Sequence, residues 1–130
     1  MEVDRNKKNI RVKSPKQLIQ SVGHAFTGFF TALKSEASLQ IQTTLGTIAI
    51  GLGFYFKIST TEWIFVILSI AAVLTAETVN SSIEELADRV TMDKDPMIKK
   101  VKDMAAGAVL ISAIASLIIG CLIFIPKFIQ

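Results

Sequence analysis

Three stretches of mostly apolar residues divide the chain, and polar segments separate them. The stretches cover residues 39–56, 63–76 and 104–125. The last holds twenty-two residues without a charge, enough for a helix to cross a hydrocarbon layer of about 30 Å. The second is short, but residues 77–90 extend it as a helix with one polar face, which can cross if that face points into protein. The pattern predicts membrane spans over about 39–57, 62–90 and 98–126.

A further helical pattern precedes the first span. Ser14 and Pro15 are typical of a helix start, with a capping hydroxyl followed by a proline in the first turn. Apolar residues then recur every three or four positions, which indicates an amphipathic helix. They are Leu18, Ile19, Val22, Phe26, Phe29, Phe30 and Leu33. Such a helix lies in the membrane interface or packs on the protein's own helices.

The elements together predict an all-α integral membrane protein, with an N-terminal amphipathic interfacial helix and three transmembrane helices. Residues 14–130 form one domain, and we interpret residues 1–13, charged and without periodicity, as a disordered basic tail. Hydrophobic residues make up 51% of the chain, which agrees with the membrane class.

The distribution of positive charge predicts the topology. Of fourteen Lys and Arg residues, seven precede the first span, five lie between the second and third, and Lys57 and Lys127 remain. The positive-inside rule therefore puts the N-terminus and the 89–103 loop in the cytoplasm. The net charge of +3 is explained by this asymmetry and by anionic lipid headgroups, so it calls for no nucleic-acid partner.

Four polar residues, Glu77, Asn80, Glu84 and Asp88, continue the helix of the second span. Their spacing places them within an arc of about 80° on one face. We expect the opposite side to carry Val79, Ile83, Leu86, Ala87 and Val90. Carboxylates at membrane depth are costly, so they indicate a functional site. The alternative is that the membrane segment ends near Glu77 and the charges are solvated.

Other polar residues are expected at the same cytoplasmic boundary, namely Glu36 before the first span and Lys102 and Asp103 at the start of the third. The sequence has no phosphate-binding glycine loop, zinc motif or cysteine cluster, and its single histidine, His24, excludes a Ser-His-Asp triad. Oxygen ligands favour Mg²⁺. Carboxylates for Mg²⁺, a lysine for phosphate and a carboxylate base are typical of phosphoryl transfer. An ion-coupled transporter or a non-catalytic scaffold stays open on these residues alone.

Two motifs resemble one known family. Residues 77–89, ETVNSSIEELADR, resemble the signature of the prokaryotic diacylglycerol kinase family, and residues 102–109, KDMAAGAV, resemble its second conserved block. The resemblance covers nearly all of residues 14–128, and the C-terminal LIIGCLIFIPKF is similar to the Gram-positive branch, which contains undecaprenol kinases. It implies an ATP-dependent kinase of a membrane alcohol, with undecaprenol favoured and diacylglycerol as the alternative. It also implies a multi-pass protein of the bacterial plasma membrane with a cytoplasmic active site.

The resemblance also implies roles for individual residues. The catalytic and lipid-contacting base corresponds to Glu77, with Asn80 beside it, and the carboxylates for Mg²⁺ and ATP correspond to Glu36 and Glu84. The expected nucleotide-binding positions are Asp93, Lys94, Asp95, Lys102 and Asp103, together with Gln17 and His24, which stand where the family often has an arginine and an aromatic residue. A homotrimer with sites shared between subunits is implied as well.

Overall fold

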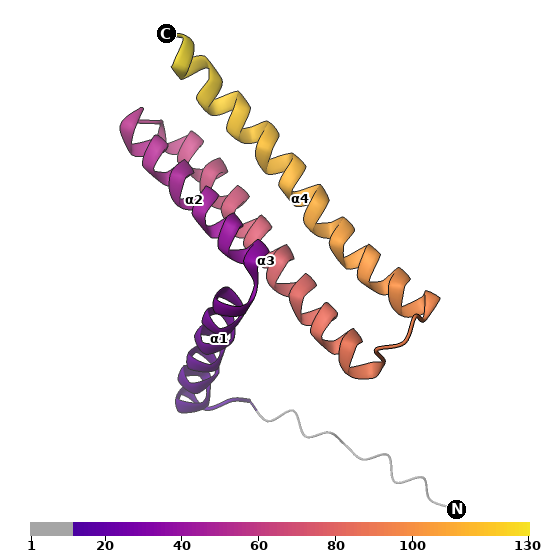
Figure 1. The fold of residues 1–130 in the computed structure, drawn as a ribbon. Coiled ribbons are helices and arrows are strands. Elements are labelled where there is room, and N and C mark those ends of the chain that lie inside the picture. Colours follow the sequence, from indigo (N-terminus) through magenta and orange to yellow (C-terminus); the bar gives the residue numbers. More distant parts are fainter. Residues whose placement is uncertain (1–11) are drawn as a thin grey trace, which may run out of the picture.

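The computed structural model describes residues 12–130, and this part of the chain forms four α-helices (Figure 1). They are α1 (Pro15–Ser35), α2 (Ala37–Tyr55), α3 (Thr60–Val90) and α4 (Pro96–Ile129). The predicted all-α fold is confirmed, and the three predicted spans coincide with α2, α3 and α4 to within three residues at each end. Of the predicted tail, Val12 and Lys13 are exposed and outside any helix, and residues 1–11 lie outside the described part.

Polar side chains cap the first turns of α1 and α3. Ser14 caps α1 as predicted: its Oγ accepts from the Gln17 N–H at 3.4 Å, and its own N–H donates to Gln17 Oε1 at 3.0 Å. Ser59 and Glu62 form the same reciprocal pair at the start of α3. Such a pair satisfies two backbone donors that the first turn leaves without partners.

The chain changes direction at Glu36, between α1 and α2. Its backbone is extended, with φ −104° and ψ 110°, so the two helices do not continue into one another. Figure 1 shows α1 leaving the other three helices at an angle. None of the residues of α1 is buried, and Leu18, Val22 and Phe26 are exposed. An exposed apolar face is what an interfacial helix needs, and that position of α1 stays a prediction.

Helix α3 is the central element, because it packs against both α2 and α4. Two glycines let α2 approach closely. A Cβ added at Gly53 would lie 2.7 Å from the Trp63 ring, and one added at Gly46 would lie 3.2 Å from the Ile70 side chain. At the far end of the bundle from the α3–α4 loop, Lys127 Nζ of α4 contacts Glu62 Oε1 of α3 at 3.0 Å. Packing and this ion pair together fix the register of the three helices.

Within the described residues, α3 and α4 are the two helices that are long and apolar enough to cross a membrane. Helix α2 has 19 residues but carries Gln40, Gln42 and several threonines, so its predicted crossing stays a prediction. Many large apolar side chains of α3 and α4 are exposed, among them Ile67, Leu68, Leu117 and Leu122. A surface of this kind suits lipid rather than water.

Candidate active site

One face of α3 is buried along most of the helix. Val66, Val73, Glu77, Asn80 and Ala87 are its buried residues, at intervals of seven, four, three and seven. These intervals follow the seven-residue period of a packed helix seam. Glu77 is 4% exposed and Asn80 is 8% exposed, so two of the four polar residues predicted to share a face are buried. Glu84 is partly buried and Asp88 is exposed. The alternative that the charges of this face are solvated therefore does not hold for Glu77, but it fits Asp88.

The prediction for the opposite side of α3 was partly wrong. Val79, Leu86 and Val90 are exposed, as expected for a face turned away from the other helices. Ala87, however, is buried on the same side as Glu77 and Asn80. The reason is geometric, since seven residues from Asn80 to Ala87 bring the side chain back to within about 20° of the same direction.

Asn80 lies between the buried part of this face and the part nearer the α3–α4 loop. Its Nδ2 donates a hydrogen bond to Glu84 Oε1 at 3.2 Å. Its Oδ1 is buried and has no hydrogen-bond partner among residues 12–130. A buried acceptor without a donor is costly, and in a native site it calls for a ligand or water. Asn80 therefore orients the Glu84 carboxylate on one side and offers a free acceptor on the other.

An ion pair joins α3 and α4 at the ends next to the loop that connects them. Lys102 Nζ donates to Asp88 Oδ1 at 2.9 Å, across the loop that joins the helices. Both side chains keep part of their surface in solvent, at 35% for Lys102 and 51% for Asp88. The Lys102 ammonium has three donors, so it can hold Asp88 and still offer donors to an anion.

A cleft of about 610 Å³ lies beside this ion pair. Five of the residues predicted to bind nucleotide line it, namely Asp93, Lys94, Asp95, Lys102 and Asp103. The loop brings them together, because Thr91 and Asp95 have extended backbones that end α3 and begin α4. All five nucleotide-binding residues predicted in and after the α3–α4 loop therefore line the same cleft.

Two residues of this cleft, Asp95 and Lys99, form contacts that were not predicted from the sequence. Asp95 caps α4, since its Oδ1 accepts from the Met97 N–H at 2.7 Å and the Ile98 N–H at 3.3 Å. Lys99, interpreted from the sequence as a topology charge, lines the cleft and forms an ion pair with Asp103. The interval of four between Lys99 and Asp103 is the signal that could have indicated this pair.

The residues predicted on α1 lie elsewhere. Gln17 and His24 are exposed and do not line the loop cleft. The Gln17 side chain closes the capping pair with Ser14, which is a structural role independent of any nucleotide. The structure of one chain therefore does not bring these two residues together with the other predicted nucleotide-binding residues.

The two carboxylates predicted for Mg²⁺ come from different parts of the chain. Glu36 lies at the α1–α2 junction and Glu84 on α3, and α1 contacts both α2 and α3. Both are partly buried, and neither forms an ion pair within the part of the chain that the structure describes. No group of three metal-binding side chains occurs among residues 12–130. Two unneutralised carboxylates still fit Mg²⁺, because substrate phosphates and waters commonly complete its shell.

A buried carboxylate on one of two long apolar helices, with a lysine-lined cleft at the end of that helix, defines a helical membrane protein with a polar site at one edge of the bundle. The sequence model of the family described as prokaryotic diacylglycerol kinase matches residues 23–124, and the chain belongs to this family. It is a lipid kinase. The transporter and scaffold alternatives have no support from this assignment.

Individual relatives differ in the lipid that their names give. An undecaprenol kinase of Bacillus subtilis is 34% identical over 111 residues, covering 85% of this chain and 90% of the relative. A diacylglycerol kinase of Pseudomonas aeruginosa is 30% identical over 93 residues, covering 72% and 76%. A diacylglycerol kinase of Escherichia coli is 25% identical over 112 residues, covering 86% and 92%. The predicted family and its Gram-positive branch are thereby confirmed, and the acceptor is left between two lipids.

Proposed function

We propose that this chain transfers the γ-phosphoryl group of ATP to undecaprenol at the cytoplasmic face of a bacterial plasma membrane. The observation that carries the proposal is the buried pair Glu77 and Asn80 on α3. The same helix reaches the loop cleft with Asp88. The similarity to the undecaprenol kinase of Bacillus subtilis supports this choice of acceptor. Diacylglycerol is the second candidate, supported by the relatives from Pseudomonas aeruginosa and Escherichia coli.

In this proposal the length of α3 separates the two substrates. Glu77 and Asp88 are eleven residues apart, or about 16 Å along a helix. A nucleoside triphosphate bound in the loop cleft can extend along α3 so that its γ-phosphate reaches Glu84. The acceptor hydroxyl would then come from the membrane side to Glu77. Glu84 lies between the two ends, two helical turns from Glu77 and one from Asp88.

Each polar side chain then has a separate task. Glu77 takes the proton of the acceptor hydroxyl, and its burial excludes water that would otherwise compete as acceptor. Asn80 holds the Glu84 carboxylate by its amide N–H. Lys102 and Lys99 hold phosphate oxygens in the cleft. Glu36 and Glu84 would hold Mg²⁺, which supplies charge neutralisation on the phosphates when it is bound.

We also propose a homotrimer with shared sites. The exposed apolar side of α3, with Val79, Leu86 and Val90, supports a contact with another subunit at the level of the site. A neighbour's α1 would bring Gln17 and His24 to the cleft, which the chain's own α1 does not do. Disulfide cross-linking between a cysteine on α1 and one on the α3–α4 loop, in separately tagged subunits, tests this arrangement.

The acceptor is tested by competition. Purified protein in mixed micelles receives radiolabelled ATP with equal amounts of undecaprenol and diacylglycerol, and the labelled lipids are separated. We expect undecaprenyl phosphate as the major product. A larger yield of phosphatidic acid would reverse the choice of acceptor and keep the class of reaction. Labelling of neither lipid would remove the proposed function itself.

A further inference from the structure

The corner between α1 and α2 is held by one side chain of α2. The last carbonyl groups of a helix have no partners within it, and at the end of α1 they include those of Leu33 and Lys34. Gln40, in the first turn of α2, reaches back to both: its Nε2 donates to the Leu33 carbonyl at 3.0 Å and to the Lys34 carbonyl at 3.4 Å. Its backbone N–H donates to the Glu36 carbonyl at 3.1 Å. Gln40 therefore contacts the end of α1 and the corner residue Glu36 at the same time.

Helix α1 has few other attachments to the bundle. Within residues 12–130, the two bonds of the Gln40 amide are the only hydrogen bonds that a side chain forms between α1 and another helix, and no ion pair joins them. None of the residues of α1 is buried, and Figure 1 shows the helix leaving the others at an angle. The orientation of α1 relative to α2 therefore depends strongly on the Gln40 side chain.

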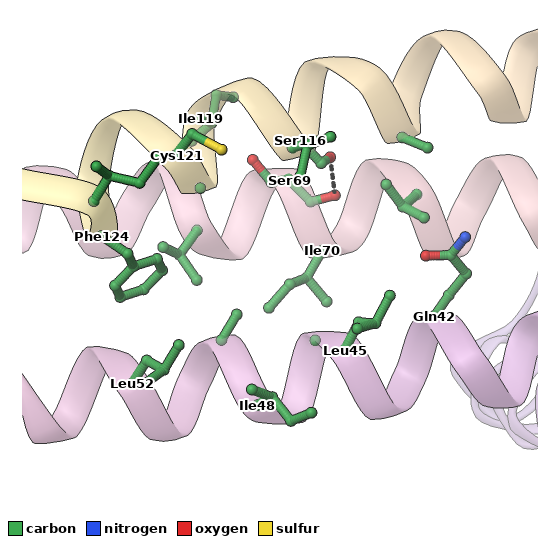
Figure 2. Close-up of a pocket in the computed structure, with 18 of the residues that line it drawn as sticks. Gln42, Leu45, Ile48, Leu52, Ser69, Ile70, Ser116, Ile119, Cys121 and Phe124 are labelled. Carbon is green, nitrogen blue, oxygen red and sulfur yellow. Dashed lines mark hydrogen bonds between the residues drawn. The ribbon is translucent and has the colours of Figure 1, made fainter. Parts of the chain in front are cut away.

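Helix α2, in contrast, packs on α3 along its length. Leu39, in its first turn, is completely buried, with 0% of its surface exposed. Figure 2 shows Leu45 and Leu52 of α2 directed towards Ile70 of α3, and these residues line an apolar cavity of about 550 Å³ that α4 also lines. Loss of the Gln40 hydrogen bonds would therefore move α1 and the corner rather than α2.

Glu36 lies at this corner with a carboxylate that the described chain does not use. It is the N-cap residue of α2, where a carboxylate commonly accepts from the backbone of the first turn, yet it forms no such hydrogen bond. It is partly buried and forms no ion pair within residues 12–130. Because its extended backbone belongs to neither helix, the hydrogen bonds on both sides of the corner decide where the carboxylate lies.

We propose that Gln40 is a positioning residue, which fixes the corner so that the Glu36 carboxylate is held in the place where it binds Mg²⁺. The inference rests on the proposed kinase function, in which Glu36 is a ligand of Mg²⁺, and adds a residue that touches neither metal nor substrate. Without the amide donors, the end of α1 would move more freely about the corner, and the carboxylate would lose more conformational entropy when it meets the metal. Metal binding would weaken, while the phosphate contacts in the loop cleft would stay the same.

Titration with Mn²⁺ tests the inference without turnover. Mn²⁺ takes the same oxygen ligands as Mg²⁺ and is detected by electron paramagnetic resonance. The purified chain is titrated in the presence of a non-hydrolysable ATP analogue. Gln40→Met keeps the length of the side chain and removes its N–H donors, so we expect the Kd for Mn²⁺ to rise about 3- to 10-fold, as for the loss of one or two hydrogen bonds. Gln20→Met is the matched control, because Gln20 is an exposed glutamine of α1 whose side chain forms no hydrogen bond within the described residues.

Two further measurements separate positioning from damage to the fold. Gln40→Met should need more Mg²⁺ for half-maximal activity but regain the native kcat at saturating Mg²⁺, which a misfolded chain would not do. In a Glu36→Gln background, Gln40→Met should cause no further loss of Mn²⁺ affinity. A further loss in that background, an unchanged Kd in Gln40→Met, or the same rise in Gln20→Met would overturn the inference.

Distances between spin labels test the corner itself. Labels are attached to cysteines at the exposed positions Lys16 of α1 and Thr47 of α2 in a Cys121→Ser background, and labelled chains are diluted with unlabelled ones. Gln40→Met should broaden the distance distribution, and Gln40→Arg, which keeps N–H donors for the helix-end carbonyls, should restore it. An unchanged distribution in Gln40→Met would overturn the inference. Broadening together with weaker Mn²⁺ binding, but without transfer of phosphate to undecaprenol or diacylglycerol, would support the inference and contradict the kinase proposal alone.

Discussion

From the Lys102–Asp88 ion pair we predict that replacing Asp88 changes the KM for ATP but hardly changes the stability of the fold. Asp88→Asn removes the charge that holds Lys102 and keeps the shape of the side chain. Because the two side chains are 35% and 51% exposed, the pair contributes about 0–1 kcal/mol to the free energy of unfolding. We therefore expect little change in thermal stability.

The effect on the nucleotide is expected to be larger. Without Asp88 the lysine side chain regains rotamer freedom, which is worth up to about 2 kcal/mol for a fully ordered lysine. Since Lys102 is only partly buried, we take about half of this value, which corresponds to a rise of about 5-fold in the KM for ATP. The turnover number should change little, because Asp88 acts through Lys102 and touches no reacting atom.

A double-mutant cycle is the assay. KM and kcat for ATP are measured for the native chain, Asp88→Asn, Lys102→Met and the double variant. If Asp88 acts by positioning Lys102, Asp88→Asn should leave the KM for ATP unchanged in the Lys102→Met background. A large fall in kcat with unchanged KM in Asp88→Asn would refute this reasoning and indicate that Asp88 takes part in the chemistry.

Three further predictions follow from the site and the topology. Glu36→Gln and Glu84→Gln should each raise the Mg²⁺ concentration needed for half-maximal activity by at least about 10-fold, because each removes an anionic ligand, and an unchanged titration curve would exclude that residue. In a Cys121→Ser background, a cysteine at Thr61 should react with an impermeant thiol reagent outside intact cells and one at Met92 should not; both positions are exposed, and the reverse pattern would reject the predicted orientation. Gln17→Ala should lower the stability of α1 by about 0.5–1 kcal/mol in amide exchange, through loss of the capping pair, whereas Gln20→Ala should not.

Local signals in the sequence were sufficient for the helices. Ser14 and Pro15 predicted the start of α1 because a cap depends on neighbouring residues alone. The loop after residue 90 was predicted because charged residues and Pro96 interrupt the apolar pattern there. The spacing of Glu77, Asn80 and Glu84 predicted a common face, since helical geometry fixes the directions of side chains on one element.

Contacts between different helices could not be predicted from these local sequence signals. The pairing of Lys102 with Asp88 depends on how the loop turns α4 back along α3, which the residue types do not specify. The capping role of Gln17 was missed because the residue was interpreted from its counterpart in the family rather than from its distance to Ser14. The apolar cavity lined by α2, α3 and α4 depends on both α2 and α4 packing on α3, so no stretch of sequence encodes it alone.

The central claim is that Glu77 accepts the proton of a lipid hydroxyl during phosphoryl transfer from ATP. Its most direct test is single-turnover transfer of radiolabelled phosphate to undecaprenol by the native chain and by Glu77→Gln, with ATP binding measured on the same samples. We expect the native chain to form undecaprenyl phosphate and the variant to be slower by at least about 10²-fold with unchanged ATP affinity, because the amide keeps the shape of the carboxylate but takes up no proton. Near-native transfer by a correctly assembled Glu77→Gln protein would contradict the account.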